Sequence, residues 1–195
     1  MRLVWRLTAG TLAAGLAACG TLPGPDDGSV DIGAGFVINL PYAPDAIRPF
    51  SAAQTAVVGF GDRQLLLTLR LRGDGRELHL VAVDGIGRRA LTLTWRPDRI
   101  DAVRAAWLPA DLPLTNLLAD IFLIYWPDDS LRQVFGETDG TLDMADRYRI
   151  ISRHGREIVR IDYPAGRETP WSGSVHYSNP VRGYTIDITS RETPP

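Results

Sequence analysis

The chain contains no lysine, and all 21 of its basic residues are arginine. We interpret this bias as background amino-acid usage rather than as a functional signal. The 23 acidic residues outnumber the arginines, so the formal net charge is −2. This charge balance does not predict the large basic surface that binding to nucleic acid requires. The single cysteine, Cys19, excludes an internal disulfide.

Motifs for catalysis and metal binding are also missing. His79, His154 and His176 lie far apart and lack the spacing of metal ligands. The sequence has no Gly-x-Ser-x-Gly turn, no His-Glu-x-x-His helix and no glycine-rich phosphate loop between a strand and a helix. The adjacent carboxylates Asp128 and Asp129 stand at an expected helix start, where capping accounts for them. We therefore predict a protein that is not an enzyme and has no cofactor and no metal site.

The N-terminus has the pattern of a targeting segment. Arg2 and Arg6 precede an apolar stretch over 7–16 that is too short to cross a bilayer, which is typical of a secretory signal peptide. Small residues then lead directly into Cys19, an arrangement that resembles the bacterial lipobox. We predict a signal peptide over 1–18 and attachment to a membrane through lipid on Cys19. Gly20, in place of Asp, indicates the outer membrane under the enterobacterial sorting rule, with the protein facing the periplasm.

The length of 195 residues and the apolar fraction of 45% fit one domain with a substantial core. Residues 20–29 are rich in Gly, Pro and Asp and favour a flexible tether, and prolines punctuate 40–49. We therefore expect residues 19–50 to form a lipidated N-terminus, tether and irregular lead-in. The folded domain is expected over 51–195.

Period-2 alternation of apolar and polar residues predicts strands on both sides of the middle of the chain. The segments 65–72, 78–82 and 91–96 alternate and are separated by glycine-containing turns, which indicates an antiparallel meander that follows a strand over 55–60. The segments 147–153 and 157–163 indicate a hairpin around His154 and Gly155, and 174–178 and 184–189 indicate a final pair. The segment 100–107 fits either a strand or a short helix.

The middle of the chain changes character. A nearly continuous apolar run at 121–126 favours a helix over 114–125, with a buried strand as the alternative. This run is too short to span a membrane and follows Asp120. A second helix is expected over 129–135, capped by Asp129 or Ser130. The order of strands, helices and strands predicts an α+β fold with a curved antiparallel sheet and helices on its concave face.

Three stretches carry a resemblance to a known family. They are residues 78–87 with 90–93, residues 112–118 running on to Trp126 and Pro127, and residues 148–151 with His154, Gly155 and 161–163. In this order, and together with the lipobox, they resemble the LolA/LolB family of lipoprotein carriers. The chain looks closer still to a lipoprotein family encoded in bacterial aryl-polyene and type II fatty-acid-synthase-like gene clusters.

The resemblance implies an incomplete β-barrel with a helical lid and an apolar cavity between them that accepts acyl chains. The implied cargo is a lipid or a lipoprotein, and the implied partners include envelope or acyl-biosynthesis proteins. The candidate lipid-binding residues are Leu67, Leu69, Leu80, Leu91, Leu93, Leu117, Ile121, Phe122, Ile124 and Tyr125.

The resemblance also points to the turn after residue 84, where the family carries a protruding leucine that inserts into the membrane. Here the matching residue is Ile86, and Arg88 and Arg89 follow it. The chain departs from the pattern at Gly85, where proline is usual. We expect Ile86, Arg88 and Arg89 to form a candidate membrane-inserting loop.

Three functions compete at this stage. The first is a lipid or lipoprotein carrier that serves export or anchoring of a lipid-linked product. The second is a structural or scaffolding lipoprotein of a biosynthetic or envelope complex, with the same fold and a filled core. The third is an enzyme that acts on an acyl intermediate, for which the sequence offers no catalytic constellation.

Overall fold

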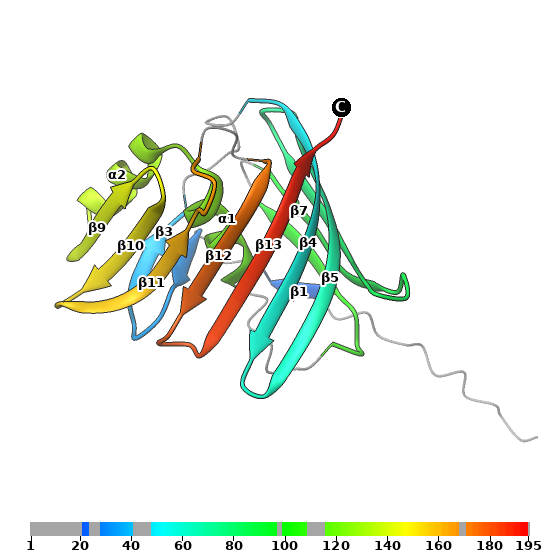
Figure 1. The fold of residues 1–195 in the computed structure, drawn as a ribbon, viewed down its shortest axis with the longest axis horizontal. Helices are drawn as coiled ribbons and strands as arrows, with labels where there is room; N and C mark the ends of the chain where they lie inside the picture. Colours follow the sequence, from blue (N-terminus) through cyan, green and yellow to red (C-terminus); the bar gives the residue numbers. More distant parts are fainter. Residues whose placement is uncertain are drawn as a thin grey trace, which may run out of the picture.

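A computed structural model describes residues 21–23, 28–40, 48–96, 99–108, 116–167 and 171–194 (Figure 1). The predicted signal peptide over 1–18, Cys19 and Gly20 lie outside these ranges. An 11-stranded antiparallel sheet dominates the fold, in the order β1-β8-β7-β6-β5-β4-β13-β12-β11-β10-β9. Its strands are β1 (Thr21–Pro23), β4 (Phe50–Phe60), β5 (Arg63–Gly73), β6 (Leu78–Asp84), β7 (Arg89–Trp95), β8 (Ile100–Arg104), β9 (Gly140–Ala145), β10 (Tyr148–Arg153), β11 (Arg156–Asp162), β12 (Gly173–Asn179) and β13 (Tyr184–Glu192).

The predicted meander is confirmed and runs unbroken from β4 to β8. Leucines and alanines at alternate positions face the interior, as in the cross-strand pairs Leu69↔Ala82 and Leu80↔Leu93. Segment 100–104 is a strand, which resolves the alternatives that the sequence left open there. The hairpin between β10 and β11 is also confirmed. His154 and Gly155 form its turn with φ angles of 52° and 74°, the left-handed backbone that a tight hairpin of this kind requires.

Pairing of β13 with β4 joins the two halves of the chain into one sheet. Ile186 lies opposite Val58 and Ile188 opposite Ala56, so the apolar faces of the two halves are continuous. Within the described ranges, β1 and β9 stand at opposite edges and do not pair, which leaves the sheet open. The α+β class and the curved antiparallel sheet are therefore confirmed. The finer likeness to the LolA/LolB family stays a prediction.

Two helices follow the meander, as expected. Helix α1 spans Leu117–Tyr125 and α2 spans Asp128–Gly136. Helix α1 lies opposite the inner face of the sheet and is enclosed, since every one of its residues except Leu117 is buried, and its description as a lid stays a prediction. A helix that is apolar all round is typical of an interior position. Capping of α2 by Asp129 or Ser130 is also wrong, since the N-cap position is Pro127 and no side chain caps the helix.

The irregular lead-in predicted over 19–50 also needs correction. A two-stranded hairpin, β2 (Ser29–Asp31) and β3 (Val37–Asn39), forms within it and buries Ile32, Phe36 and Ile38 in the core. The ring of Phe36 packs at the start of β9, where a Cβ atom on Gly140 would clash with it. Glycine is thus required at 140 by this close approach. The hairpin is therefore part of the folded domain.

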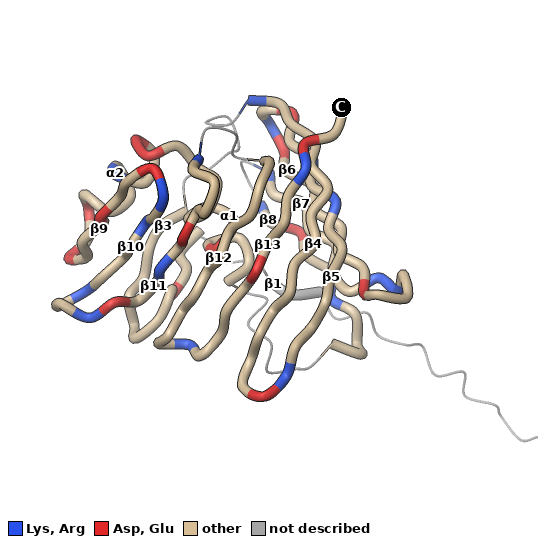
Figure 2. The backbone as a smooth tube through the Cα atoms, viewed as in Figure 1, with Lys and Arg blue, Asp and Glu red and all other residues tan. Residues whose placement is uncertain are grey.

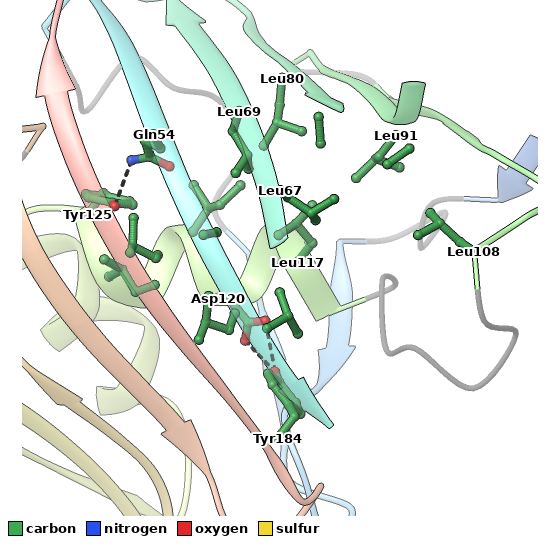
Figure 3. A pocket seen from close by; sticks show the side chains of 18 residues that line it. Gln54, Leu67, Leu69, Leu80, Leu91, Leu108, Leu117, Asp120, Tyr125 and Tyr184 are labelled. Carbon is green, nitrogen blue, oxygen red and sulfur yellow. Dashed lines mark hydrogen bonds between the residues drawn. The ribbon is translucent and has the colours of Figure 1, made fainter. Parts of the chain in front are cut away.

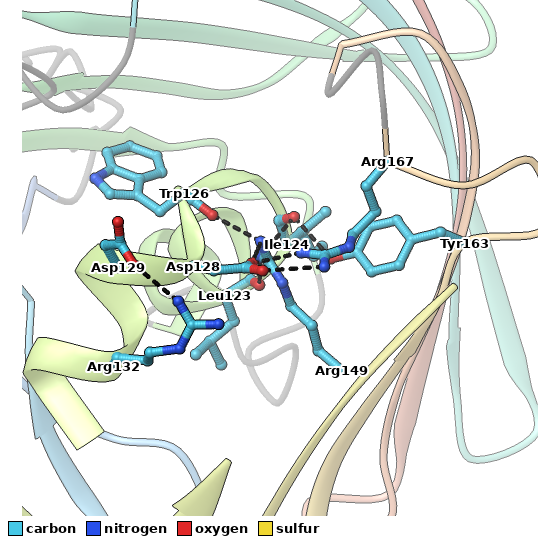
Figure 4. Close-up of polar contacts among 9 residues, drawn as sticks. All are labelled: Leu123, Ile124, Trp126, Asp128, Asp129, Arg132, Arg149, Tyr163 and Arg167. Atoms are coloured by element: carbon cyan, nitrogen blue, oxygen red, sulfur yellow. Dashed lines mark hydrogen bonds and ion pairs between the residues drawn. The ribbon is translucent and has the colours of Figure 1, made fainter. Parts of the chain in front are cut away.

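A buried arginine holds α1 in the interior (Figure 4). Arg149, on β10, donates through Nη1 to the carbonyl oxygens of Leu123 (2.6 Å) and Ile124 (3.0 Å). Its Nη2 donates to the carbonyl oxygen of Trp126 and to Asp128 Oδ1, both at 2.8 Å. The last carbonyls of a helix lack partners within the helix and must be satisfied when they are buried. One guanidinium from the sheet thus donates hydrogen bonds to the last carbonyl groups of α1 and forms an ion pair with Asp128 at the start of α2.

We predict that Arg149→Met lowers the free energy of unfolding by about 3 kcal/mol or more, because it removes the side-chain donor of the Leu123 and Trp126 carbonyl groups, whereas Ile124 keeps the Tyr163 hydroxyl. Arg132→Met is the matched control, since Arg132 forms an exposed ion pair with Asp129 and its loss is expected to cost under about 1 kcal/mol. Urea denaturation measures both changes. Equal midpoints for the Arg149 and Arg132 variants would contradict this role for Arg149.

Candidate functional site

A cavity of about 60 Å³ lies between α1 and the inner face of the sheet (Figure 3). Inward-facing side chains of β4, β5, β6, β7 and β13 form one wall, and α1 forms the other. Most of the lining is aliphatic. The full lining is Gln54, Ala56, Val58, Leu67, Leu69, Leu80, Ala82, Ala90, Leu91, Leu108, Leu117, Asp120, Ile121, Ile124, Tyr125, Tyr184, Ile186 and Ile188.

Most residues predicted to bind lipid meet at this cavity. Of the ten, only Leu93 and Phe122 do not line it. Both are buried in the core instead, with exposures of 4% and 0%. The ring of Phe122 packs toward Trp126, at 5.6 Å between ring centroids. The helical spacing that suggested Phe122 identifies a buried residue, but it does not say which side of a fully buried helix meets the cavity.

Small side chains on the sheet explain why space remains. Ala56, Ala82 and Ala90 occupy inward positions on three strands, among leucines on the same wall. Protein interiors are otherwise packed at the density of organic crystals. A water molecule takes about 30 Å³ in the liquid, and an engineered cavity of about 150 Å³ holds benzene. The cavity therefore has room for roughly two methylene groups as it stands, and a longer chain would require the surrounding side chains to move.

One carboxyl group lines this apolar space. Asp120, on α1, accepts hydrogen bonds from the Tyr177 hydroxyl through Oδ1 (2.5 Å) and from the Tyr184 hydroxyl through both oxygens (2.8 Å each). Burial raises the pKa of Asp120 to about 7, against the opposing effects of the two hydroxyl groups and the positive charge of Arg182. Burial also raises the pKa values of Tyr177 and Tyr184 well above the ordinary value, so both hydroxyls remain protonated donors.

A second set of polar side chains lies in another part of the cavity wall. Gln54 Nε2 donates to the Tyr125 hydroxyl (2.8 Å) and to Ser190 Oγ (2.9 Å). Figure 3 shows Gln54 and Tyr125 on one side of the cavity and Asp120 with Tyr184 on another. These contacts fix α1 against β4 and β13 through hydrogen bonds as well as packing.

Sequence reasoning missed the polar members of this site, namely Gln54, Asp120, Tyr177, Tyr184 and Ser190. Only Asp120 carried a usable signal, because an acidic residue beside an apolar run is costly to bury unless it has partners. The partners stand 57 and 64 residues farther along the chain. Their meeting depends on the pairing of β12 and β13 under α1, which no local pattern specifies.

The turn between β6 and β7 is built around Asp84. Its Oδ1 accepts hydrogen bonds from the backbone N–H groups of Ile86 (3.1 Å) and Arg88 (2.8 Å), and its Oδ2 accepts from Arg88 Nε (2.7 Å). Ile86 is 80% exposed at the tip. The Arg88 guanidinium lies 4.4 Å from the centre of the Trp107 ring, and Trp107 Nε1 donates to the carbonyl oxygen of Arg89. The charge of Arg88 is therefore partly neutralised, and Arg89 is exposed beside it.

Charged residues of both signs are interspersed at turns and strand ends (Figure 2). Among the residues that the structure describes, no three His, Cys, Asp or Glu side chains form a group able to hold a metal ion. Neither described helix has the length and apolar character needed to cross a membrane.

The geometry defines an open-sheet α+β protein with an apolar cavity beside a central helix. The chain belongs to the family described as "Protein of unknown function (DUF3261)", which matches residues 51–192. No protein in a search of curated sequences matches it. The family match covers the sheet from β4 to β13 and both helices, but its description assigns no function, and the resemblance to the LolA/LolB family remains a prediction.

We predict that Asp120→Asn alters the pH dependence of stability. The folded-state pKa of about 7 lies above 3.8, the ordinary value for an unburied aspartate. The stabilising contribution of the protonated carboxyl is thus complete below about pH 4 and is lost as the pH rises through 7. Relative to wild type, the Asn variant should gain stability across this range, by up to roughly 4 kcal/mol, or three pKa units at about 1.4 kcal/mol each.

Urea denaturation of both proteins at several pH values between 4 and 8 measures this difference. Only its change with pH matters, because the substitution also has a pH-independent effect. A difference that stays constant over the whole range would show that Asp120 titrates normally.

Proposed function

We propose that this protein is an envelope lipoprotein that holds the apolar chain of a lipid, an acyl compound or a lipoprotein in the cavity between α1 and the sheet. Lipid on Cys19 anchors it to the outer membrane, facing the periplasm. Its role in this proposal is export or anchoring of a lipid-linked product. The observation that supports the proposal best is the aliphatic cavity, where alanines stand among the leucines of the sheet within the buried core.

A scaffolding lipoprotein without a ligand is the second candidate. The small volume of about 60 Å³ favours it, because natural cores also contain small voids. The two candidates differ in whether lipid accompanies the protein during purification, and mass spectrometry of an organic extract tests this directly.

The anchor is tested by Cys19→Ser. Without the thiol, diacylglycerol has no attachment point, so we expect the variant to remain uncut by lipoprotein signal peptidase and to incorporate no radioactive palmitate. Wild-type protein labelled in parallel is the control. Incorporation of label into the variant would contradict the lipobox interpretation.

The cavity is tested by Ala82→Val, which adds two methyl groups to its wall. Because these groups occupy space that a chain needs, co-purified lipid should fall by about tenfold, while the free energy of unfolding falls by no more than about 1–3 kcal/mol, the usual cost of added carbon atoms in a core. Val81→Ile is the matched control, since the neighbouring side chain points to the outer face of the sheet. An unchanged amount of co-purified lipid in the Ala82 variant would show that the lipid does not bind in this cavity.

The turn between β6 and β7 is the proposed membrane contact in this function. An apolar side chain that is 80% exposed and an adjacent exposed arginine, Arg89, suit the surface of an anionic bilayer, where each cation contributes about 1 kcal/mol. The ion pair of Arg88 with Asp84 gives Arg88 a structural role in shaping the turn.

We predict that Ile86→Glu leaves folding intact, because the tip is exposed, but reduces transfer of bound lipid or lipoprotein to outer-membrane vesicles. Ile86→Leu keeps an apolar tip and should retain transfer. A fluorescence assay that follows labelled cargo into vesicles makes the comparison. Equal transfer by the Glu and Leu variants would contradict a membrane contact at this turn and would leave it only the role of connecting β6 to β7.

A further inference from the structure

The polar groups of the cavity wall differ in what they can offer a ligand. Among the described residues of the lining, Asp120 has the one carboxyl group, and no arginine or histidine is present. The positive charge of Arg182 lowers the pKa of Asp120 by electrostatic attraction at a distance. The Nη2 atom of Arg182 instead donates a hydrogen bond to the carbonyl oxygen of Asp31, at 2.6 Å. No cation in the described lining can therefore neutralise an anion that enters.

The hydroxyl donors beside Asp120 and the amide of Gln54 already have acceptors. The hydroxyl of Tyr184 donates to Asp120, as does that of Tyr177 behind it. Gln54 Nε2 donates to Tyr125 and Ser190, and the hydroxyls of these two residues lie 3.3 Å from each other. A ligand carboxylate needs such donors, because transfer of an unpaired anion into an apolar site is very costly.

The carboxyl oxygens of Asp120 can accept more hydrogen bonds than they do. A carboxyl group offers about four lone-pair sites on its two oxygens. Asp120 Oδ1 accepts from two tyrosines, whereas Oδ2 accepts only from the Tyr184 hydroxyl, which it shares with Oδ1. Asp120 thus presents spare acceptor capacity in the wall of an aliphatic cavity.

From this arrangement we propose that the cavity selects amphiphiles whose polar end donates a hydrogen bond to Asp120, namely an alcohol or a protonated amine, and disfavours free fatty-acid anions. The inference rests on the proposed lipid-binding function and narrows its ligand class. An aliphatic chain contacts the leucines and alanines of the sheet, while its hydroxyl or ammonium group donates to Oδ2. A carboxylate at the same place meets the like charge of ionised Asp120, whose two tyrosine donors are already engaged.

The test uses three ten-carbon probes that carry the same photoreactive diazirine in the chain and end in a hydroxyl, an ammonium or a carboxylate group. The full lipid-modified protein is irradiated with each probe at pH 8, and mass spectrometry locates the label. We expect labelling of segments 77–88 and 90–96, which contain Leu80, Ala82, Ala90 and Leu91, with the alcohol and the amine at least about tenfold above the carboxylate.

Asp120→Asn should raise labelling by the carboxylate probe and lower labelling by the amine probe, with little change for the alcohol. Asp187→Asn is the matched control, because it removes the same charge from a side chain that is 62% exposed and paired with His176 outside the cavity. It should leave all three probes as in wild type. Labelling by the alcohol shows in the same experiment that the Asp120 variant is folded.

If that variant does not fold, wild-type protein compared at pH 6 and pH 8 gives a second readout. Ionisation of Asp120 across this range should lower carboxylate labelling and raise amine labelling at the cavity. Equal labelling by all three probes, or a preference for the carboxylate, overturns the inference and leaves the lipid-binding proposal standing. Absence of cavity labelling by any probe overturns the lipid-binding proposal as well.

Discussion

The position of α1 depends on the hydrogen bonds that Arg149 donates to its C-terminal carbonyl groups. A helix end in a protein interior carries several unpaired acceptors, and water is not there to satisfy them. A planar guanidinium with fixed donor directions can reach more than one of these acceptors, which a lysine ammonium does less well. The ion pair with Asp128, which Arg167 also contacts, supplies the opposite charge that a buried cation requires.

The cavity follows from the same placement. Because α1 is enclosed, nearly all of its residues are buried, and the cavity lies where the sheet presents alanines among its leucines. Asp120 and its two tyrosines add a polar contact between α1 and the strands β12 and β13. The core thus contains both the packing that stabilises α1 and a cavity with a buried carboxyl group in its wall.

Much of the fold was predictable from the sequence, because alternation of apolar and polar residues has a direct structural cause. The meander, the hairpin at His154 and Gly155, and the final pair of strands all follow from period-2 patterns bounded by turn residues. The hairpin of β2 and β3 was missed because its strands are only three residues each and lie in a glycine-rich segment. Strand β9 was missed as well, since its residues alternate only between half-buried and exposed at a sheet edge.

The candidate site was predictable in its aliphatic part and not in its polar part. Leucines at alternate strand positions face one interior, so Leu67, Leu69, Leu80 and Leu91 come together as soon as the meander is recognised. The partners of Asp120 and Gln54 come from the C-terminal strands, whose pairing with β4 is a long-range choice. Arg149 gave no signal either, because an arginine in an alternating strand is ordinarily interpreted as a solvent-facing residue.

Methyl NMR of the full protein, ¹³C-labelled at alanine and held in deuterated detergent with 1-decanol, tests the central claim most directly. If the cavity binds apolar chains, nuclear Overhauser effects should connect the decanol methylenes to the methyl groups of Ala56, Ala82 and Ala90, which line it. Contacts that appear only at alanines outside the cavity, or no contacts at all, would contradict the claim.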